Sequence, residues 1–172
     1  MKENFSTNRL VTVALVAALY AVLTVALAPI SYGNLQFRVS ELMVLLAFFD
    51  PFYIGGLTLG CFIANLLGPN GIMDVIFGTL ATFVSVSAIN LTAKYTKGSK
   101  LGLGIASIWP TLFNGLIIGW MLNYLFQLPL ALTILEVGFG EFVVVSIVGV
   151  PLFVLIMQRY PHLLSIHKKN LA

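Results

Sequence analysis

Charged residues are scarce in this chain, and their scarcity excludes a soluble globular domain. Of the 172 residues, 9% are charged and 59% are hydrophobic, whereas a soluble domain carries roughly 25% charged residues. The nine Lys and Arg residues form no block large enough to suggest nucleic-acid binding. The composition therefore predicts an integral membrane protein.

Cysteine is nearly absent from the sequence, and the common catalytic motifs are missing. The single cysteine, Cys61, excludes an internal disulfide framework. The sequence has no His-Glu-x-x-His helix, no Gly-x-Ser-x-Gly elbow, no Cys-x-x-Cys pair and no Gly-x-x-x-x-Gly-Lys-Ser/Thr phosphate loop. We therefore expect no enzymatic activity, no metal and no cofactor. Uphill transport by this protein would need an ion gradient or a partner ATPase.

Long apolar runs separated by turn signals are the main feature that is present. The runs are continuous rather than alternating, which argues against a β-barrel. We predict an all-α membrane protein, a compact bundle of six transmembrane helices forming one domain over residues 1–172. The expected spans are about Leu10–Ala28, Val39–Phe49, Phe52–Leu67, Ile72–Ala93, Leu101–Leu125 and Ala131–Met157.

Two of these spans need comment. Leu10–Ala28 exceeds the roughly 7–15 apolar residues of a cleaved signal, and more spans follow it, so we expect it to be retained. Val39–Phe49 is short for a transmembrane helix. Either it begins inside the preceding loop or it does not cross the bilayer fully.

The basic residues predict the orientation. Six spans place the N-terminus, the turn at Asp50, the Lys94–Lys100 loop and the C-terminus on one side. Every Lys and Arg except Arg38 lies on that side. The positive-inside rule makes it cytoplasmic, with residues 1–9 and 159–172 as cytoplasmic tails.

The polar stretch Ser31–Glu41 interrupts the apolar pattern. It holds Tyr32, Gln36, Arg38 and Glu41 between two apolar runs. A hydrogen-bonding cluster at the mouth of an apolar body suggests a site for a small polar molecule. A polar loop with a local Arg38–Glu41 pair, three residues apart, explains the same residues. The sequence leaves both interpretations open.

Four acidic residues, Glu41, Asp74, Glu136 and Glu141, lie at or below the outer mouth in this topology. A charge at mid-helix depth costs at least ~2.5–3.5 kcal/mol, and Arg38 is the one basic residue on that side. The excess of carboxylates suggests a ligand that is rich in hydrogen-bond donors or positively charged. Glu141 is the favoured ligand group and Glu136 a candidate partner for Arg38. Asp74 either contacts the ligand or complements a positive helix end.

Other candidates are an amide and three aromatic residues. Asn114, beyond a kink expected at Pro110, either faces the pocket or bonds another helix. Tyr32, Phe37 and Trp120 can stack on a planar ring. Tyr and Trp near the outer side also serve as interfacial anchors.

Small residues with four-residue spacing mark surfaces where helices can approach closely. The pairs are Ala14 with Ala18, Ala17 with Ala21, and Gly56 with Gly60. Alanine is also simply common in membrane helices.

Four segments carry a resemblance to a known family. They are Ala14–Ala21, Ile30–Glu41, Ile63–Leu66 with Gly68-Pro69, and Asp74–Ala81. They closely resemble the queuosine-precursor transporter (QueT) family, whose members are substrate-binding S-components of energy-coupling factor (ECF) transporters. The resemblance runs from about Arg9 to Pro151, and Gln36–Glu41 and Asp74–Ala81 are its specific parts.

The resemblance implies a six-helix bundle in the bacterial inner membrane that binds its substrate near the outer face. The loop Pro29–Arg38 would act as a lid. Ala14 and Ala18 would dock on a transmembrane coupling protein, and two cytoplasmic ATPases would power the complex. The S-component is thought to topple in the membrane to release its substrate.

The implied substrate is a 7-deazaguanine, such as 7-aminomethyl-7-deazaguanine or queuine. Its N–H edge suits one carboxylate, a protonated side amine suits a second, and its flat ring suits the aromatic residues. The candidate binding residues are Tyr32, Gln36, Phe37, Arg38, Glu41, Asp74, Asn114, Trp120, Glu136 and Glu141. The alternatives are an S-component for another flat vitamin and a proton-coupled carrier with Glu136 or Glu141 as its relay.

Overall fold

The computed structural model describes residues 7–33 and 35–159, and these ranges contain helices and no strand. Four helical segments are long and apolar enough to cross a membrane: Arg9–Ala26, Gly71–Tyr95, Lys100–Phe126 and Leu130–Arg159. Two shorter apolar helices, Val39–Phe48 and Phe52–Leu66, lie among them. The all-helical class is therefore confirmed, while the count of six membrane crossings remains a prediction.

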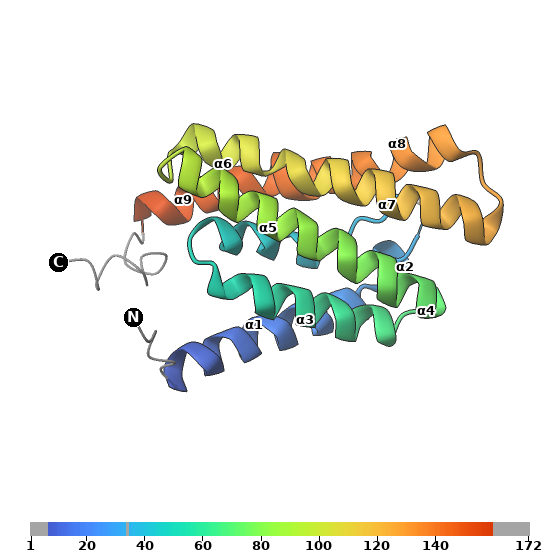
Figure 1. Ribbon diagram of the computed structural model, residues 1–172, viewed down its shortest axis with the longest axis horizontal. Coiled ribbons are helices and arrows are strands. Elements are labelled where there is room, and N and C mark those ends of the chain that lie inside the picture. Colours follow the sequence, from blue (N-terminus) through green and yellow to red (C-terminus); the bar gives the residue numbers. More distant parts are fainter. Residues whose placement is uncertain (1–6, 34, 160–172) are drawn as a thin grey trace.

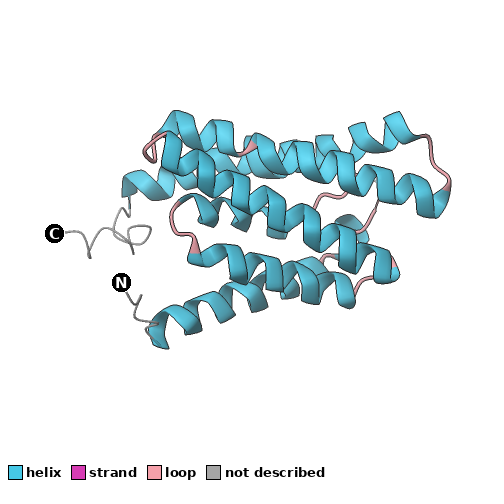
Figure 2. Cartoon of the chain, viewed as in Figure 1, coloured by secondary structure: helices cyan, strands magenta, loops and turns pink. Residues whose placement is uncertain are grey.

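The helices run side by side along the long axis of the molecule (Figure 1, Figure 2). In chain order they are α1 (Thr7–Ala26), α2 (Ala28–Ser31), the 3₁₀ helix η1 (Val39–Phe48), α3 (Phe52–Leu66), α4 (Gly71–Met73), the π-helix η2 (Asp74–Gly78), α5 (Thr79–Tyr95), α6 (Lys100–Ala106), α7 (Ile108–Phe126), α8 (Leu130–Glu141), the π-helix η3 (Phe142–Gly149) and α9 (Val150–Arg159). The first described helix begins, and the last one ends, at the same end of the bundle (Figure 1).

Prolines explain two of the breaks between helices. Pro110 has no N–H to donate to the carbonyl of Ala106, and its ring crowds that carbonyl. Helix α6 accordingly ends at Ala106 and α7 begins at Ile108, so the predicted kink is a short interruption. Pro51 lies between η1 and α3. The residue before a proline disfavours helical backbone, which explains the break between these two helices.

Glycines on α3 let α1 approach closely. A Cβ atom added at Gly56 would lie 2.8 Å from the carbonyl oxygen of Val13, and one at Gly60 would lie 2.8 Å from that of Ala17. Real side chains do not approach so closely. The expectation that the Gly56/Gly60 pair is a close-packing surface is confirmed.

The two alanine pairs of α1 face different surroundings. Ala17 and Ala21 are buried in the bundle, whereas Ala14 and Ala18 are exposed on its outer surface. The helix therefore uses one small-residue pair for its own packing and leaves the other accessible.

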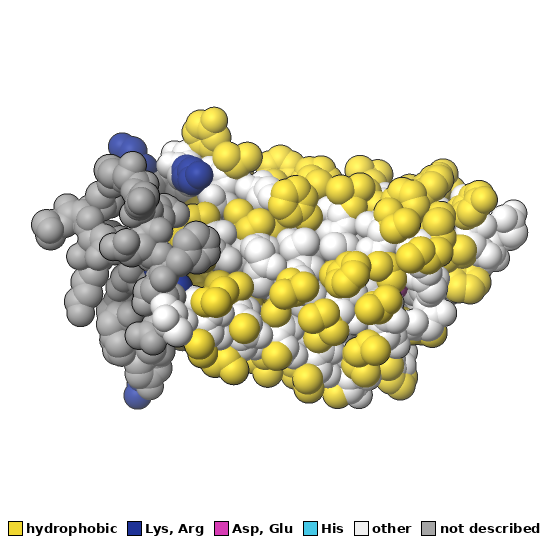
Figure 3. Space-filling model, turned by 60° about the horizontal axis from the view of Figure 1, so that its bottom comes forward, with side chains coloured by type: hydrophobic (Ala, Val, Ile, Leu, Met, Phe, Trp, Pro, Cys, Tyr) yellow, Lys and Arg dark blue, Asp and Glu magenta, His cyan; other side chains and the backbone are white. Residues whose placement is uncertain are grey.

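The surface of the bundle is apolar along its length. Figure 3 shows hydrophobic side chains spread along the length of the visible face and Lys and Arg side chains at one end. Several charged side chains, Arg38 and Glu41 among them, are instead deeply buried. An apolar exterior around a polar interior is what a bilayer requires of a protein that contains buried charges.

Candidate functional site

A group of buried polar side chains lies between α1, η1, η2, α3 and α5, and we call it the polar cluster. None of its members is more than 4% exposed. They are Tyr20, Arg38, Glu41, Cys61, Asn65, Asp74 and Thr82. Since an uncompensated charge is costly at such depth, each charged member needs partners close by.

The two carboxylate oxygens of Glu41 differ in their hydrogen bonding. Its Oε1 accepts a hydrogen bond from the Tyr20 hydroxyl and another from Thr82 Oγ1 at 3.3 Å. Its Oε2 is buried and has no hydrogen-bond partner among the described residues. One oxygen is therefore held by the protein while the other keeps its hydrogen-bonding capacity.

The side chain of Arg38 is held by several contacts, but not all of its nitrogen atoms make hydrogen bonds. Its Nη1 donates to Cys61 Sγ at 3.8 Å, and its guanidinium carbon lies 5.4 Å from the centre of the Tyr32 ring. Its Nη2 lies 4.0 Å from Asp74 Oδ2, and neither Nη2 nor Nε makes a hydrogen bond within the described part of the chain. The expectation that Glu136 is the partner of Arg38 is wrong, because Asp74 forms this ion pair.

Asp74 lies at the first position of η2 and is fully buried. Asn70 Nδ2 donates to its Oδ2 at 3.3 Å, and Asn65 Nδ2 donates to its backbone carbonyl at 3.1 Å. A Cβ at Gly78 would lie 2.5 Å from Asn65 Nδ2 and 2.6 Å from Asp74 Oδ1. The glycine therefore provides the space in which Asn65 and Asp74 meet.

Glu141, at the end of α8, extends this polar region from the other side of the bundle. It is 2% exposed, and its carboxyl is in hydrogen-bonding contact with Asn114 of α7. Its Oε2 has no hydrogen-bond partner in the described ranges. Both Asn114 and Glu141 thus lie inward, beside the polar cluster.

The loop between α2 and η1 packs closely against α8. A Cβ at Gly140 would lie 1.7 Å from the carbonyl oxygen of Leu35, and the rings of Phe37 and Phe139 meet edge to face at 6.5 Å. Gln36 is buried with a φ of +42°, a conformation that non-glycine residues rarely adopt. Its Nε2 also has no hydrogen-bond partner among the described residues.

Tyr32 fastens the beginning of the same loop to α3. Its hydroxyl donates to the carbonyl of Ala64 at 2.5 Å. A Cβ at Gly68 would lie 2.7 Å from the edge of its ring. The loop is thus held at both ends while its middle contacts α8.

Each 3₁₀ or π-helical segment of the described chain starts beside a charged residue of this region. The 3₁₀ helix η1 follows Arg38 and carries Glu41 in its first turn. The π-helix η2 begins at Asp74, and η3 begins directly after Glu141. Since π-helical turns are rare and are found frequently at functional sites, the backbone marks the same place as the side chains.

Two predicted site residues lie elsewhere. Trp120 is 43% exposed, stacks on Tyr124 at 5.9 Å and meets Phe77 edge to face at 5.2 Å. This placement fits the interfacial-anchor alternative. Glu136 is partly exposed on α8, outside the polar cluster.

Tyr20, Cys61, Asn65 and Thr82 were not predicted as site residues. Each lies within an apolar or Ser/Thr-rich run, where a single polar group is easily taken for packing. Cys61 and Asn65 are four residues apart and therefore share a face of α3. That spacing is the signal in the sequence that places them together, and Asn65 Nδ2 donates to Cys61 Sγ at 3.3 Å.

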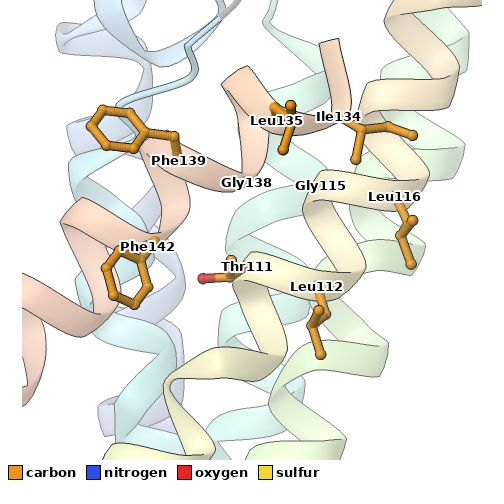
Figure 4. A pocket seen from close by; sticks show the side chains of 9 residues that line it. All are labelled: Thr111, Leu112, Gly115, Leu116, Ile134, Leu135, Gly138, Phe139 and Phe142. Atoms are coloured by element: carbon orange, nitrogen blue, oxygen red, sulfur yellow. The ribbon is translucent and has the colours of Figure 1, made fainter. Parts of the chain in front are cut away.

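A separate groove of about 400 Å³ lies between α7 and α8 (Figure 4). It is lined by Thr111, Leu112, Gly115, Leu116, Ile134, Leu135, Gly138, Phe139 and Phe142. Leu116 and Leu135, at 55% and 69% exposure, lie on its outer rim. Its lining carries no charge, so it does not suit a polar solute.

The cluster itself does not resemble a metal centre. In residues 7–33 and 35–159, no group of three or more His, Cys, Asp and Glu side chains is arranged to hold a metal ion. Unpaired donors and acceptors buried at the centre of a helical bundle are instead typical of membrane proteins that bind a polar solute within the membrane.

Comparison with known proteins specifies this class. Residues 10–158 match the model of the QueT transporter family, and the chain therefore belongs to that family. Its sequence is 49% identical over 89 residues to the queuosine precursor transporter QueT of Lactococcus lactis subsp. cremoris (strain MG1363). No solved structure matches the chain.

The match to the Lactococcus protein covers 51% of this chain and 52% of that relative, so it spans about half of each. The resemblance noted in the sequence is confirmed by the family match. A family of membrane transporters also agrees with the expectation that the chain is not an enzyme.

Proposed function

We propose that this protein is the substrate-binding subunit of an importer for a queuosine precursor. The substrate would be a 7-deazaguanine such as 7-aminomethyl-7-deazaguanine or queuine. The name of the Lactococcus relative supports this class of substrate. The observation that carries the proposal is the set of buried polar atoms without hydrogen-bond partners among the described residues.

These atoms comprise both donors and acceptors. The donors are Arg38 Nε and Nη2 and Gln36 Nε2, and the acceptors are Glu41 Oε2, Asn65 Oδ1, Asp74 Oδ1 and Glu141 Oε2. An unsatisfied buried group costs ~1–3 kcal/mol, so a ligand that supplies several partners binds favourably. A guanine-like edge presents a carbonyl acceptor beside N–H donors, which matches Arg38 beside Glu41.

Charge and shape point to the same ligand. The buried region holds three carboxyl groups, those of Glu41, Asp74 and Glu141, and one guanidinium, that of Arg38, which lies 4.0 Å from Asp74. The excess negative charge favours a ligand with a protonated amine. A flat ring can pack against Tyr32 or Phe37 at the loop, and Asn114 orients Glu141.

The exposed pair Ala14/Ala18 supports a docking surface for a transmembrane coupling protein. Small residues let a partner helix approach closely in lipid. Because the chain has no phosphate-binding loop, we assign ATP hydrolysis to two cytoplasmic ATPases of an ECF complex. In this proposal the protein is the S-component of that complex.

The proposed setting is the bacterial inner membrane, with one domain of six spans over residues 1–172. The two shorter helices, Val39–Phe48 and Phe52–Leu66, would complete the six. Cytoplasmic ends are supported by the start of α1 and the end of α9 lying at the same end of the bundle (Figure 1) and by the basic residues near that end. Most of both predicted tails lies outside the described residues.

Binding to the purified protein in detergent tests the proposal. We would titrate 7-aminomethyl-7-deazaguanine, queuine and guanine against wild type, Glu41→Gln, Asp74→Asn and Glu141→Gln. Glu136→Gln is the matched control, because it changes an acid of α8 outside the polar cluster. We expect tight binding of a deazaguanine, weakened in Glu41→Gln, Asp74→Asn and Glu141→Gln and retained in the control.

The substrate assignment is overturned if correctly folded wild type binds none of these compounds. Tight binding of a different flat vitamin by the same protein would instead support an S-component for that vitamin. Equal loss in Glu136→Gln and Glu141→Gln would place the site elsewhere.

A proton-coupled carrier is the second candidate, and one observation favours it. Glu41 and Glu141 each keep one buried carboxylate oxygen without a hydrogen-bond partner among the described residues, and a buried acid that lacks partners can take up a proton. Uptake that collapses with an uncoupler while ATP stays available would support the carrier. Uptake that requires the partner ATPases would support the S-component.

A further inference from the structure

We propose that Tyr20 and Thr82 are positioning residues, which hold the Glu41 carboxylate so that its free oxygen selects ligands with an N–H donor. This inference rests on the proposed function, because it concerns how the same site discriminates between substrates. Neither residue was expected from the sequence to belong to the site.

The geometry at Glu41 is asymmetric. Tyr20 comes from α1 and Thr82 from α5, and both donate to the same oxygen, Oε1. The three side chains are at most 1% exposed, so bulk water does not compete for these bonds. With Oε1 fixed from two helices, Oε2 can point in one direction and remains unpaired among the described residues.

The count of available protons shows why both hydroxyls matter. Each hydroxyl has one proton to donate. Thr82 Oγ1 lies 3.3 Å from Glu41 Oε1 and 3.2 Å from Cys61 Sγ, so its proton is shared between two acceptors. The Tyr20 hydroxyl donates to Glu41 Oε1 as well. Loss of the Tyr20 hydroxyl would therefore leave the carboxylate with one divided donor, and loss of the Thr82 hydroxyl would leave it with Tyr20 alone, so either loss gives the carboxylate freedom to rotate.

A fixed acceptor makes the site selective for the edge of the ligand that it meets. The backbone N–H of Glu41 donates to the carbonyl of Arg38 at 2.9 Å, so the side chains of these two residues project from the same turn of the backbone. In a guanine-like ring the ring N–H lies between the carbonyl and the exocyclic amine, so a ligand whose carbonyl accepts from Arg38 presents both donors toward Glu41 Oε2. A ligand without the amine offers Oε2 one donor fewer, which a site built to pair with that amine penalises.

The pair of probes is 7-deazaguanine and 7-deazahypoxanthine, which lacks the exocyclic amine. Affinities are measured for wild type, Tyr20→Phe, Thr82→Val and Thr82→Ser, each checked for folding by its melting temperature. Tyr53→Phe and Thr133→Val are controls, because Tyr53 lies outside the cluster and Thr133 Oγ1 donates to the carbonyl of Pro129, at the start of its own helix. The quantity of interest is the ratio of the two dissociation constants.

We expect wild type to prefer 7-deazaguanine on the order of 10- to 100-fold. Tyr20→Phe and Thr82→Val should each lower this preference several-fold while the variants stay folded. Thr82→Ser keeps the hydroxyl and should retain the wild-type ratio, and the two controls should leave it unchanged. If Tyr20→Phe does not fold, the Thr82 variants decide the result.

Two other outcomes have distinct meanings. If wild type prefers 7-deazaguanine and folded Tyr20→Phe and Thr82→Val keep its full preference, or lose affinity for both probes equally, the positioning role is overturned. The proposed function would survive that result. If wild type binds neither probe nor the aminomethyl compound, the proposed function fails and this inference fails with it.

Discussion

The polar cluster and the groove between α7 and α8 are both formed where helices meet, yet they are opposite in character. The cluster is closed, charged and cross-linked by hydrogen bonds from several helices. The groove is open and lined by apolar side chains (Figure 4). Their difference shows that close helix contacts alone do not make a polar site.

Backbone irregularity separates the two regions further. Helices η1 and η2 contribute residues to the cluster, and η3 begins beside Glu141. The groove lies mainly between the regular helices α7 and α8, whose glycines Gly115 and Gly138 face each other. Irregular turns alter the direction of side chains along a helix, which regular packing does not.

The largest expected effect comes from removing the cation of the cluster. Arg38→Met keeps a long side chain but leaves the buried carboxylates without a compensating charge. Breaking a buried ion pair in this way costs ~3–5 kcal/mol, so we expect a much lower melting temperature and no measurable deazaguanine binding. Thermal unfolding in detergent measures the first effect. Unchanged stability would show that solvent or protons compensate the acids.

A glycine pair compares the two regions directly. Gly78→Ala would push a Cβ against Asn65 and Asp74, whereas Gly138→Ala would meet its nearest atom, the carbonyl oxygen of Thr111, at 3.5 Å. We expect Gly78→Ala to cost roughly 1–3 kcal/mol and to weaken binding at least about 10-fold. Gly138→Ala should stay within about 0.5 kcal/mol. Equal effects would remove the distinction between cluster and groove.

Asn114 tests the connection between the two regions, because it lies on the groove-forming helix α7 and reaches Glu141. Asn114→Ala removes the hydrogen bond to that carboxyl. A lost bond to a charged group costs roughly 1.5–3 kcal/mol, which corresponds to about 10- to 150-fold weaker binding if the ligand uses Glu141. Isothermal titration would measure this loss. Wild-type affinity would exclude a binding role for Asn114.

Thr111 should show the smallest effect. Its Oγ1 is buried without a hydrogen-bond partner among the described residues, and its side chain lines the groove. Thr111→Val replaces an unpaired hydroxyl by a methyl group of similar size. We expect stability within about 0.5 kcal/mol of wild type, or slightly higher, and unchanged binding. Loss of binding would show that the groove communicates with the site.

Much of the site could be recognised from the sequence, because polar groups in apolar runs stand out. Arg38, Glu41, Asp74 and Glu141 were singled out as charges that need partners, and the structure places them in one region. Their partners were harder to predict. Glu136 was a candidate for Arg38, but a helix presents its residues in different directions, and the structure shows Asp74 beside Arg38.

The sequence by itself determined the membrane class, the positions of most helices and the family. With so few charged residues the chain is not soluble outside a membrane. Pro51 and Pro110 interrupt helices whatever their tertiary surroundings. The tertiary structure decided which side chains meet. It brought Tyr20 and Thr82 to Glu41 and turned Trp120 outward. These outcomes depend on how each helix is rotated against its neighbours, and packing across the whole bundle sets that rotation.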